Sequence, residues 1–150
     1  MMVTHRTFTK SLFATAILAM GLAGCSSMMP SNKVTLTGRL SASQEVPPTV
    51  SSATGMAEAW LNKDTNVLTW KVTFSGLTGP ATAGHFHGPA AAGANAGVVV
   101  PFAGTTSPLE GQATLTPAQA ADLLAGKWYA NIHTAANKGG EIRGQMTPKM

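Results

Sequence analysis

The stretch LTWKVTF, residues 68–74, alternates apolar and polar side chains along its whole length. Successive side chains of a β-strand point to opposite faces of a sheet, so this period of two predicts a strand with one buried face. The segment ATGMAEAWL, residues 53–61, has the pattern of a partner strand, and the turn-forming residues NKDTN lie between them at 62–66. We therefore expect a β-hairpin over residues 53–74.

Strand patterns continue on both sides of this hairpin, separated by clusters of glycine and proline. Val34, Leu36 and Leu40 predict a first strand, and later strands are predicted over residues 84–87, 97–102, 109–115, 128–133 and 141–146. Several short strands in a chain of this length are typical of two packed antiparallel sheets. The sequence thus predicts an all-β domain built as an antiparallel β-sandwich.

One segment departs from the strand pattern and predicts a short helix. Thr116 suits the N-cap, Pro117 the first helical position, and Gln119 the third position after the cap, which together make a capping box. Good helix formers follow over residues 118–125, and Gly126 is suited to end the helix. We expect about two helical turns between two strands.

The composition indicates one folded domain and excludes several classes of protein. Of 150 residues, 44% are hydrophobic and 11% are charged, which is too apolar for a disordered chain. The net charge is +4, and without residues 1–24 the chain keeps eight basic and six acidic side chains, so no nucleic-acid partner is expected. Cys25 is the single cysteine, so an intrachain disulfide is excluded.

The N-terminal segment has the pattern of a secretory signal. Its first ten residues carry basic side chains and no acid, and the apolar run over 12–22 is shorter than the roughly 20 residues that span a bilayer. Residues 22–25, LAGC, resemble the lipobox of bacterial lipoproteins. This resemblance implies cleavage after residue 24 and acylation of Cys25, for example by palmitate.

The lipobox resemblance also divides the chain and suggests a location. It makes residues 1–24 a signal peptide, residues 25–32 a lipidated tether and residues 33–150 the folded domain. Two or three acyl chains anchor a protein stably, so we expect a membrane partner and a place in the cell envelope. Ser26 follows the cysteine, which in such lipoproteins favours the outer membrane over the inner one. A protein partner is not indicated, and a homodimer is left open.

Alternation along the later strands places the remaining histidines on common faces. In residues 128–133, WYANIH, the larger apolar side chains share the core face, which leaves His133 on the outward face. In His85-Phe86-His87 the phenylalanine is the natural core residue, so both histidines point outward together. Their α-carbons are about 6.6 Å apart, close enough for two imidazoles to meet one ion.

Three neutral imidazoles suit a transition metal. Copper is favoured because Cu(II) binds nitrogen donors most tightly among the divalent ions of its row, with zinc and iron as alternatives. Glu141, Glu45 or water could supply a further ligand, and Arg143 could either pair with Glu141 or present positive charge to an anion. The competing interpretation is structural, with His85 and His87 hydrogen-bonding neighbouring loops.

Three segments in order resemble the CHRD domain, named from chordin and common as a secreted bacterial module. The likeness runs from about Val34 to Met146, and the segments that carry it are LTG…EVPP…ATG (36–55), GHFHGPA (84–90) and NIHT…GEIRGQ (131–145). The resemblance implies a secreted all-β domain whose biochemistry is little defined. The cysteine-rich growth-factor-binding modules that accompany it in chordin are missing here.

A weaker resemblance concerns the histidine segment alone. Residues 84–88, GHFHG, are similar to the copper-ligand strand of copper–zinc superoxide dismutase, a β-sandwich enzyme. The resemblance implies that His85 and His87 bind copper, that His133 is a third ligand, and that Arg143 guides an anion. It fits either an immunoglobulin-like or a superoxide-dismutase-like sandwich. The chain lacks the histidines for a zinc site, so a zinc-containing dismutase is excluded.

Three functions therefore follow as hypotheses. The first is a lipid-anchored CHRD domain of the cell envelope that captures a transition metal, copper above all, through His85, His87 and His133. The second is a metal-dependent oxidoreductase that resembles superoxide dismutase, with an open coordination position. The third is a non-catalytic structural or interaction module of the envelope.

Overall fold

The computed structural model describes residues 1, 2 and 32–149, so the predicted signal peptide and Cys25 lie outside the described residues. The described part contains eight strands, one 3₁₀ turn and one helix: β1 (Lys33–Ser41), η1 (Ala42–Gln44), β2 (Thr54–Asn62), β3 (Val67–Ser75), β4 (Ala81–His87), β5 (Val98–Pro101), β6 (Leu109–Thr114), α1 (Pro117–Leu124), β7 (Trp128–Thr134) and β8 (Ile142–Pro148). None of the helices in the described part is long and apolar enough to cross a membrane.

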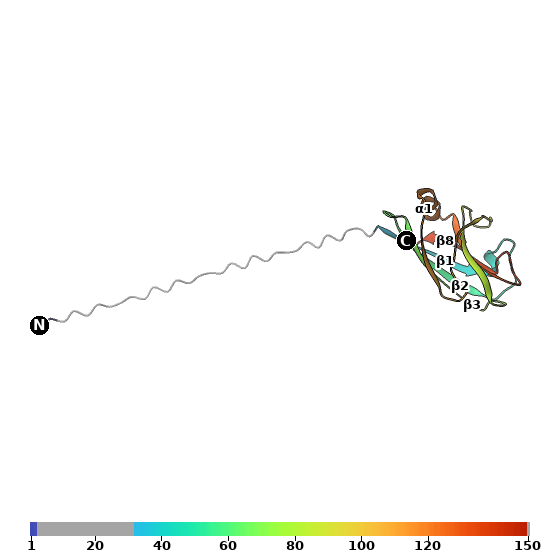
Figure 1. Ribbon diagram of the computed structural model, residues 1–150, viewed down its shortest axis with the longest axis horizontal. Coiled ribbons are helices and arrows are strands. Elements are labelled where there is room, and N and C mark those ends of the chain that lie inside the picture. Colours follow the sequence, from blue (N-terminus) through green and yellow to red (C-terminus); the bar gives the residue numbers. More distant parts are fainter. Residues whose placement is uncertain (3–31, 150) are drawn as a thin grey trace.

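The strands form one antiparallel sheet with the order β5-β4-β7-β8-β1-β2-β3-β6. Figure 1 shows β8, β1, β2 and β3 side by side in this order. The predicted hairpin is confirmed, because β2 and β3 pair without a break from Thr54 opposite Ser75 to Asn62 opposite Val67. The prediction of an all-β fold with one short helix is also confirmed.

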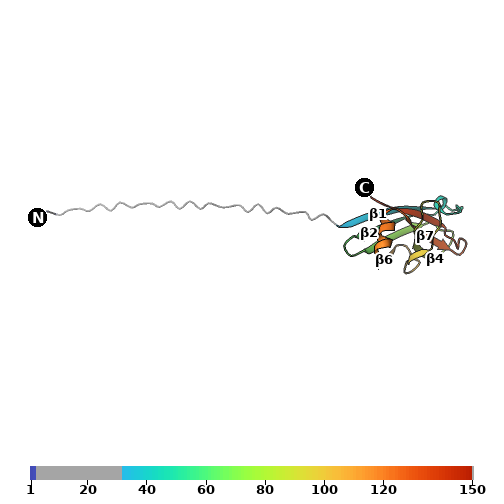
Figure 2. The ribbon, with the colours of Figure 1, turned by 90° about the horizontal axis from the view of Figure 1, so that it is seen from above.

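The two layers expected of a sandwich are two halves of this single, strongly curved sheet. Trp70 on β3 and Phe86 on β4 lie near opposite ends of the strand order, yet their ring centroids are 5.6 Å apart. A Cβ atom on Gly84 of β4 would meet Leu109 of β6 at 3.3 Å. Figure 2 accordingly shows β4 and β6 on the same side of the molecule. The sheet therefore closes almost into a barrel around one apolar core.

Helix α1 begins with the predicted capping box. The backbone N–H of Gln119 donates to the hydroxyl of Thr116 at 3.2 Å, and the side-chain oxygen of Gln119 accepts from the N–H of Thr116 at 2.8 Å. Gly126 follows the helix with φ of 71°, a left-handed conformation that glycine adopts without strain. The caps thus fix both ends of a helix whose inner side chains, Ala120 and Leu123, enter the core.

Strand β7 is buried on both faces, which distinguishes it from an ordinary half-exposed strand. Trp128, Ala130 and Ile132 belong to the apolar core. The other three alternate residues, Tyr129, Asn131 and His133, are between 2% and 9% exposed although they face away from that core. Beside the core, the fold therefore contains a second, polar interior that lies on the outer face of β4, β7 and β8.

Candidate metal centre

Two neighbouring strands bring the three histidines together. His85 and His87 stand two residues apart on β4, and β7 places His133 next to them, with Asn131 opposite His85 and Tyr129 opposite His87 in the register. One ring nitrogen from each histidine lies within 4.8 Å of the others, a group able to hold a metal ion. The predicted convergence of these histidines is confirmed.

The exposure of this face differs from the sequence expectation. The histidines share an outward face as expected, but His87 and His133 are only 8% and 9% exposed, and His85 alone is partly open to solvent. Two loops, residues 88–97 and 135–141, cover the face through hydrogen bonds to its side chains. The cluster is thus mostly buried, with His85 as its partly exposed member, rather than a surface patch.

Backbone carbonyls of these loops fix which ring nitrogens carry protons. Nδ1 of His87 lies 3.0 Å from the carbonyl oxygen of Ala96, and Nδ1 of His133 lies 2.9 Å from that of Lys138. A carbonyl oxygen can only accept, so each Nδ1 is the protonated nitrogen of a neutral ring. The Nε2 atoms of both rings therefore turn a lone pair toward the centre, as metal-ligating histidines do.

Burial also lowers the pKa values of His85 and His87. The pKa of His85 falls to about 4 through loss of solvation, reinforced by the neighbouring His133 and His87. Burial likewise lowers the pKa of His87, although its hydrogen-bond partners Ala96 and Asn131 oppose this effect. At neutral pH these two imidazoles therefore have lone pairs available without first losing a proton.

Asn131 is a member of the cluster that the sequence analysis did not single out. Its Oδ1 lies 3.0 Å from Nε2 of His87 and 3.0 Å from Nε2 of His133. Its Nδ2 donates on the opposite side to the carbonyl oxygen of Gly139 at 3.4 Å. The alternation that placed His133 on the outward face also places Asn131 there, so the signal was present in the sequence.

Glu141, considered as a further ligand, has a different environment. It is fully buried, and its two oxygens accept hydrogen bonds from Ser51, Thr134, Asn137 and both the hydroxyl and N–H of Thr78. Burial raises its pKa, but the bonds from Ser51, Thr134 and Thr78 outweigh burial and lower the pKa to about 2. The structure does not bring Glu141 to the histidines; its carboxylate joins three loops instead.

Glu45, the other acidic candidate, lies beside the polar interior but outside the histidine group. It is 5% exposed, and its Oε1 has no hydrogen-bond partner in the part of the chain that the structure describes. Burial raises its pKa to about 7, against the opposing charge of Arg143 and a bond from the backbone of Val46. A side chain on Gly140 would collide with both Glu45 Oε1 and Asn131 Nδ2, so these two groups pack around the same glycine.

Arg143 is also buried, at 2% exposure, and takes part in a stack of three side chains. Its guanidinium carbon lies 3.4 Å from the ring centroid of Tyr129, and it donates to the carbonyl of Ala94 at 2.7 Å and to Asn95 Oδ1 at 3.1 Å. The imidazole of His87 stacks on Tyr129 from the side of β4, whereas Arg143 comes from β8. Tyr129 therefore separates Arg143 from the histidines.

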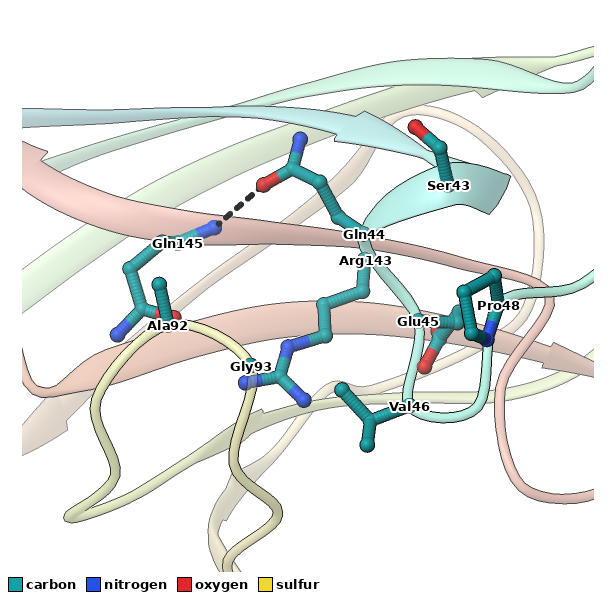
Figure 3. A pocket seen from close by; sticks show the side chains of 9 residues that line it. All are labelled: Ser43, Gln44, Glu45, Val46, Pro48, Ala92, Gly93, Arg143 and Gln145. Atoms are coloured by element: carbon teal, nitrogen blue, oxygen red, sulfur yellow. Dashed lines mark hydrogen bonds between the residues drawn. The ribbon is translucent and has the colours of Figure 1, made fainter.

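The expected alternative pairing of Arg143 with Glu141 is wrong. Within residues 32–149 the structure shows two salt bridges, Lys71–Glu110 and Lys127–Asp122, and neither includes Arg143. The guanidinium instead reaches into a cavity of about 310 Å³ between the 88–97 loop and residues 43–48 (Figure 3). Figure 3 shows it extending toward the loop at Gly93, with Glu45 beside it.

Comparison with protein families agrees with this architecture. The model of the CHRD domain matches residues 36–146, which include all three clustered histidines as well as Asn131 and Arg143. Searches of curated proteins and of solved structures found no match. Because the matched segment spans most of the chain, the protein belongs to the CHRD domain family.

Proposed function

We propose that this CHRD domain binds a transition metal ion, copper in the first place, through His85, His87 and His133. One observation carries the proposal: Nε2 of His87 and Nε2 of His133 both present lone pairs to the oxygen of Asn131. Both Nδ1 protons are engaged by Ala96 and Lys138, so neither ring has a proton to place between these atoms. A cation at this point would stabilise all three groups.

A purely structural cluster would be expected to pair each acceptor with a donor, because a buried acceptor without a donor costs about 1–3 kcal/mol. His85 could supply a donor to one of these acceptors, Nε2 of His133, because its own Nδ1 lies 3.0 Å from that atom. Among residues 32–149, the hydrogen-bond contact of His87 Nε2 is with the amide oxygen of Asn131. This unmet requirement at His87 favours metal binding over the structural interpretation.

The donor set favours copper among the metals that imidazole binds. Nitrogen donors bind Cu(II) more tightly than the other divalent ions of the first row, and zinc and iron are the nearest alternatives. An imidazole that binds a metal ion does so as a neutral ligand, so a bound ion would keep its full charge. Capture of copper at the cell envelope is the function that these features support best.

A second candidate function is oxidoreduction of the superoxide dismutase kind. It rests on the partial exposure of His85, which leaves one side of the site open to a small molecule. The charge of Arg143 acts on His87 across Tyr129, so Arg143 would influence an incoming anion from a distance rather than by contact. Superoxide consumption by the copper-loaded protein, lost in His87→Ala, would support this activity.

Copper stoichiometry tests the binding proposal. We expect about one copper per chain after dialysis, with His87→Ala reducing this to background. Thr116→Ala is a matched control, because loss of an N-cap costs about 1 kcal/mol of stability at a place remote from the histidines. Equal copper retention by His87→Ala and wild type would reject the proposal.

We also propose that the domain is tethered to the cell envelope, on the outer membrane, by acylation of Cys25. The lipobox pattern at residues 22–25 and the serine that follows support this placement. Cys25→Ala should abolish labelling by radioactive palmitate and move the protein from the membrane fraction to the soluble fraction. Unchanged labelling and fractionation of this variant would reject the anchor.

A further inference from the structure

The oxygen of Asn131 occupies the same position as a metal ligand would. It is 2% exposed and lies 3.0 Å from each of two unprotonated ring nitrogens, those of His87 and His133. Three electron-pair donors thus converge without a hydrogen among them. Atoms that each carry a lone pair come this close to one another when they bind the same cation.

The neighbours of the amide fix the direction in which its oxygen points. Its Nδ2 group faces the carbonyl oxygen of Gly139 at 3.4 Å. The carboxyl oxygen of Glu45 lies on the same side, because both groups flank the Cα of Gly140. Rotating the amide by half a turn would place its oxygen against these acceptors, so the environment favours an oxygen directed at the histidines.

The separations also agree with the spacing of ligands around one ion. Two donors bound at about 2.1 Å and at right angles lie about 3.0 Å apart, whereas a tetrahedral angle separates them by about 3.4 Å. Three distances between the candidate ligand atoms are each 3.0 Å. They join Nδ1 of His85 to Nε2 of His133, Nε2 of His133 to Oδ1 of Asn131, and Oδ1 of Asn131 to Nε2 of His87. Right-angled coordination by nitrogen and oxygen is typical of Cu(II).

We propose that Oδ1 of Asn131 is a fourth ligand of the metal and that it selects Cu(II) over Cu(I). This inference rests on the proposed copper-binding function. An amide oxygen is a hard donor that suits a divalent ion, whereas Cu(I) prefers softer ligands. Asn131 therefore stabilises Cu(II) specifically, whereas the three imidazoles bind both Cu(II) and Cu(I).

Affinities for Cu(II) and Cu(I), each measured by competition with a chelator, test this assignment. Asn131→Leu keeps the approximate shape of the side chain and removes the oxygen. We expect it to weaken Cu(II) binding by about 10–100-fold and to change Cu(I) binding by less than about threefold. Asn131→Asp keeps an oxygen toward the histidines but places a second one against the carbonyl of Gly139, which costs affinity for both ions alike. We therefore expect it to keep the wild-type preference for Cu(II) over Cu(I).

The variants separate ligation from support of the rings. Equal weakening of Cu(II) and Cu(I) binding in Asn131→Leu would show a positioning role and overturn the assignment. Loss of the preference for Cu(II) over Cu(I) in Asn131→Asp, which still has the oxygen, would also overturn the assignment. This second test stands even if the leucine variant fails to fold. The Cu(II) paramagnetic resonance spectrum should change in Asn131→Leu, since one ligand is lost.

Asn62→Leu is the matched control, because this asparagine lies at the end of β2, where its Oδ1 accepts from the N–H groups of Asp64 and Thr65 rather than from a residue of the cluster. Both of its copper affinities should equal those of wild type. Wild-type protein that binds neither oxidation state would overturn the proposed function together with this inference. Wild-type protein that binds Cu(II) with an unchanged affinity in Asn131→Leu would overturn the inference alone.

Discussion

The imidazole of His87 lies flat against the ring of Tyr129, with the ring planes 1° from parallel and their centroids 4.8 Å apart. The hydroxyl of Tyr129 lies 3.2 Å from the backbone nitrogen of Ala96, whose carbonyl oxygen accepts from Nδ1 of His87. Tyr129 thus holds His87 in place in two ways. Its ring stacks on the imidazole, and its hydroxyl binds Ala96, whose carbonyl oxygen fixes the tautomer of His87. The histidine cluster and the 88–97 loop that covers it are therefore a single hydrogen-bonded unit.

Replacing Tyr129 by phenylalanine should loosen this loop without removing the stacked ring. The N–H of Ala96 would lose its acceptor, at a cost of about 1 kcal/mol. We expect faster hydrogen exchange at the Ala96 amide and unchanged exchange in β2 and β3. An Ala96 amide that exchanges as slowly as in wild type would contradict the support that we assign to the hydroxyl.

Glu141→Gln should destabilise the fold at neutral pH. The carboxylate has a folded pKa of about 2 against an ordinary value of 4.5, so the stability it contributes is complete above pH 4.5 and is lost as pH falls toward 2. We expect a loss of about 3 kcal/mol in unfolding free energy at pH 7. The difference from wild type should shrink between pH 4.5 and 2 in denaturant titrations; a difference that does not vary with pH would contradict this role.

Glu45→Gln should have the opposite effect. Burial raises the folded pKa of Glu45 to about 7, so the folded state loses stability as pH rises from 4.5 to 7. The glutamine variant lacks this penalty, and we expect it to be more stable than wild type at pH 8, by up to about 3 kcal/mol. The two proteins should have similar stability near pH 4.5. Lower stability of Glu45→Gln at pH 8 would show that the carboxylate has a partner we have not identified.

Gly140→Ala should disturb the polar interior directly. Its φ of 130° is unfavourable for other residues, and a Cβ atom there would collide with Glu45 and approach Asn131 Nδ2 at 2.8 Å. We expect a loss of about 1–3 kcal/mol in stability together with weaker copper binding. Gly139→Ala is the control, since no heavy atom of the other described residues lies within 4 Å of its Cβ position. Equal effects of the two substitutions on copper binding would contradict the close packing around Gly140.

The elements that depend on local patterns were predictable from the sequence. Alternation located β3 and the face shared by His85 and His87, and the capping residues located the start of α1. The burial of the histidines was not predictable, because the loops that cover them have no periodic pattern. The hydrogen bonds to Glu141 from hydroxyls of two loops and of β7 depend on contacts between segments distant in sequence, and so does the closure of one sheet onto itself.

Diffraction at the copper absorption edge from crystals of the copper-loaded protein would locate the ion. We expect one anomalous peak per chain, about 2.0–2.2 Å from Nε2 of His87 and from Nε2 of His133 and in contact with the ring of His85. Stoichiometric copper located elsewhere, with the Nε2 atoms of His87 and His133 bound to no metal, would contradict the proposed binding site.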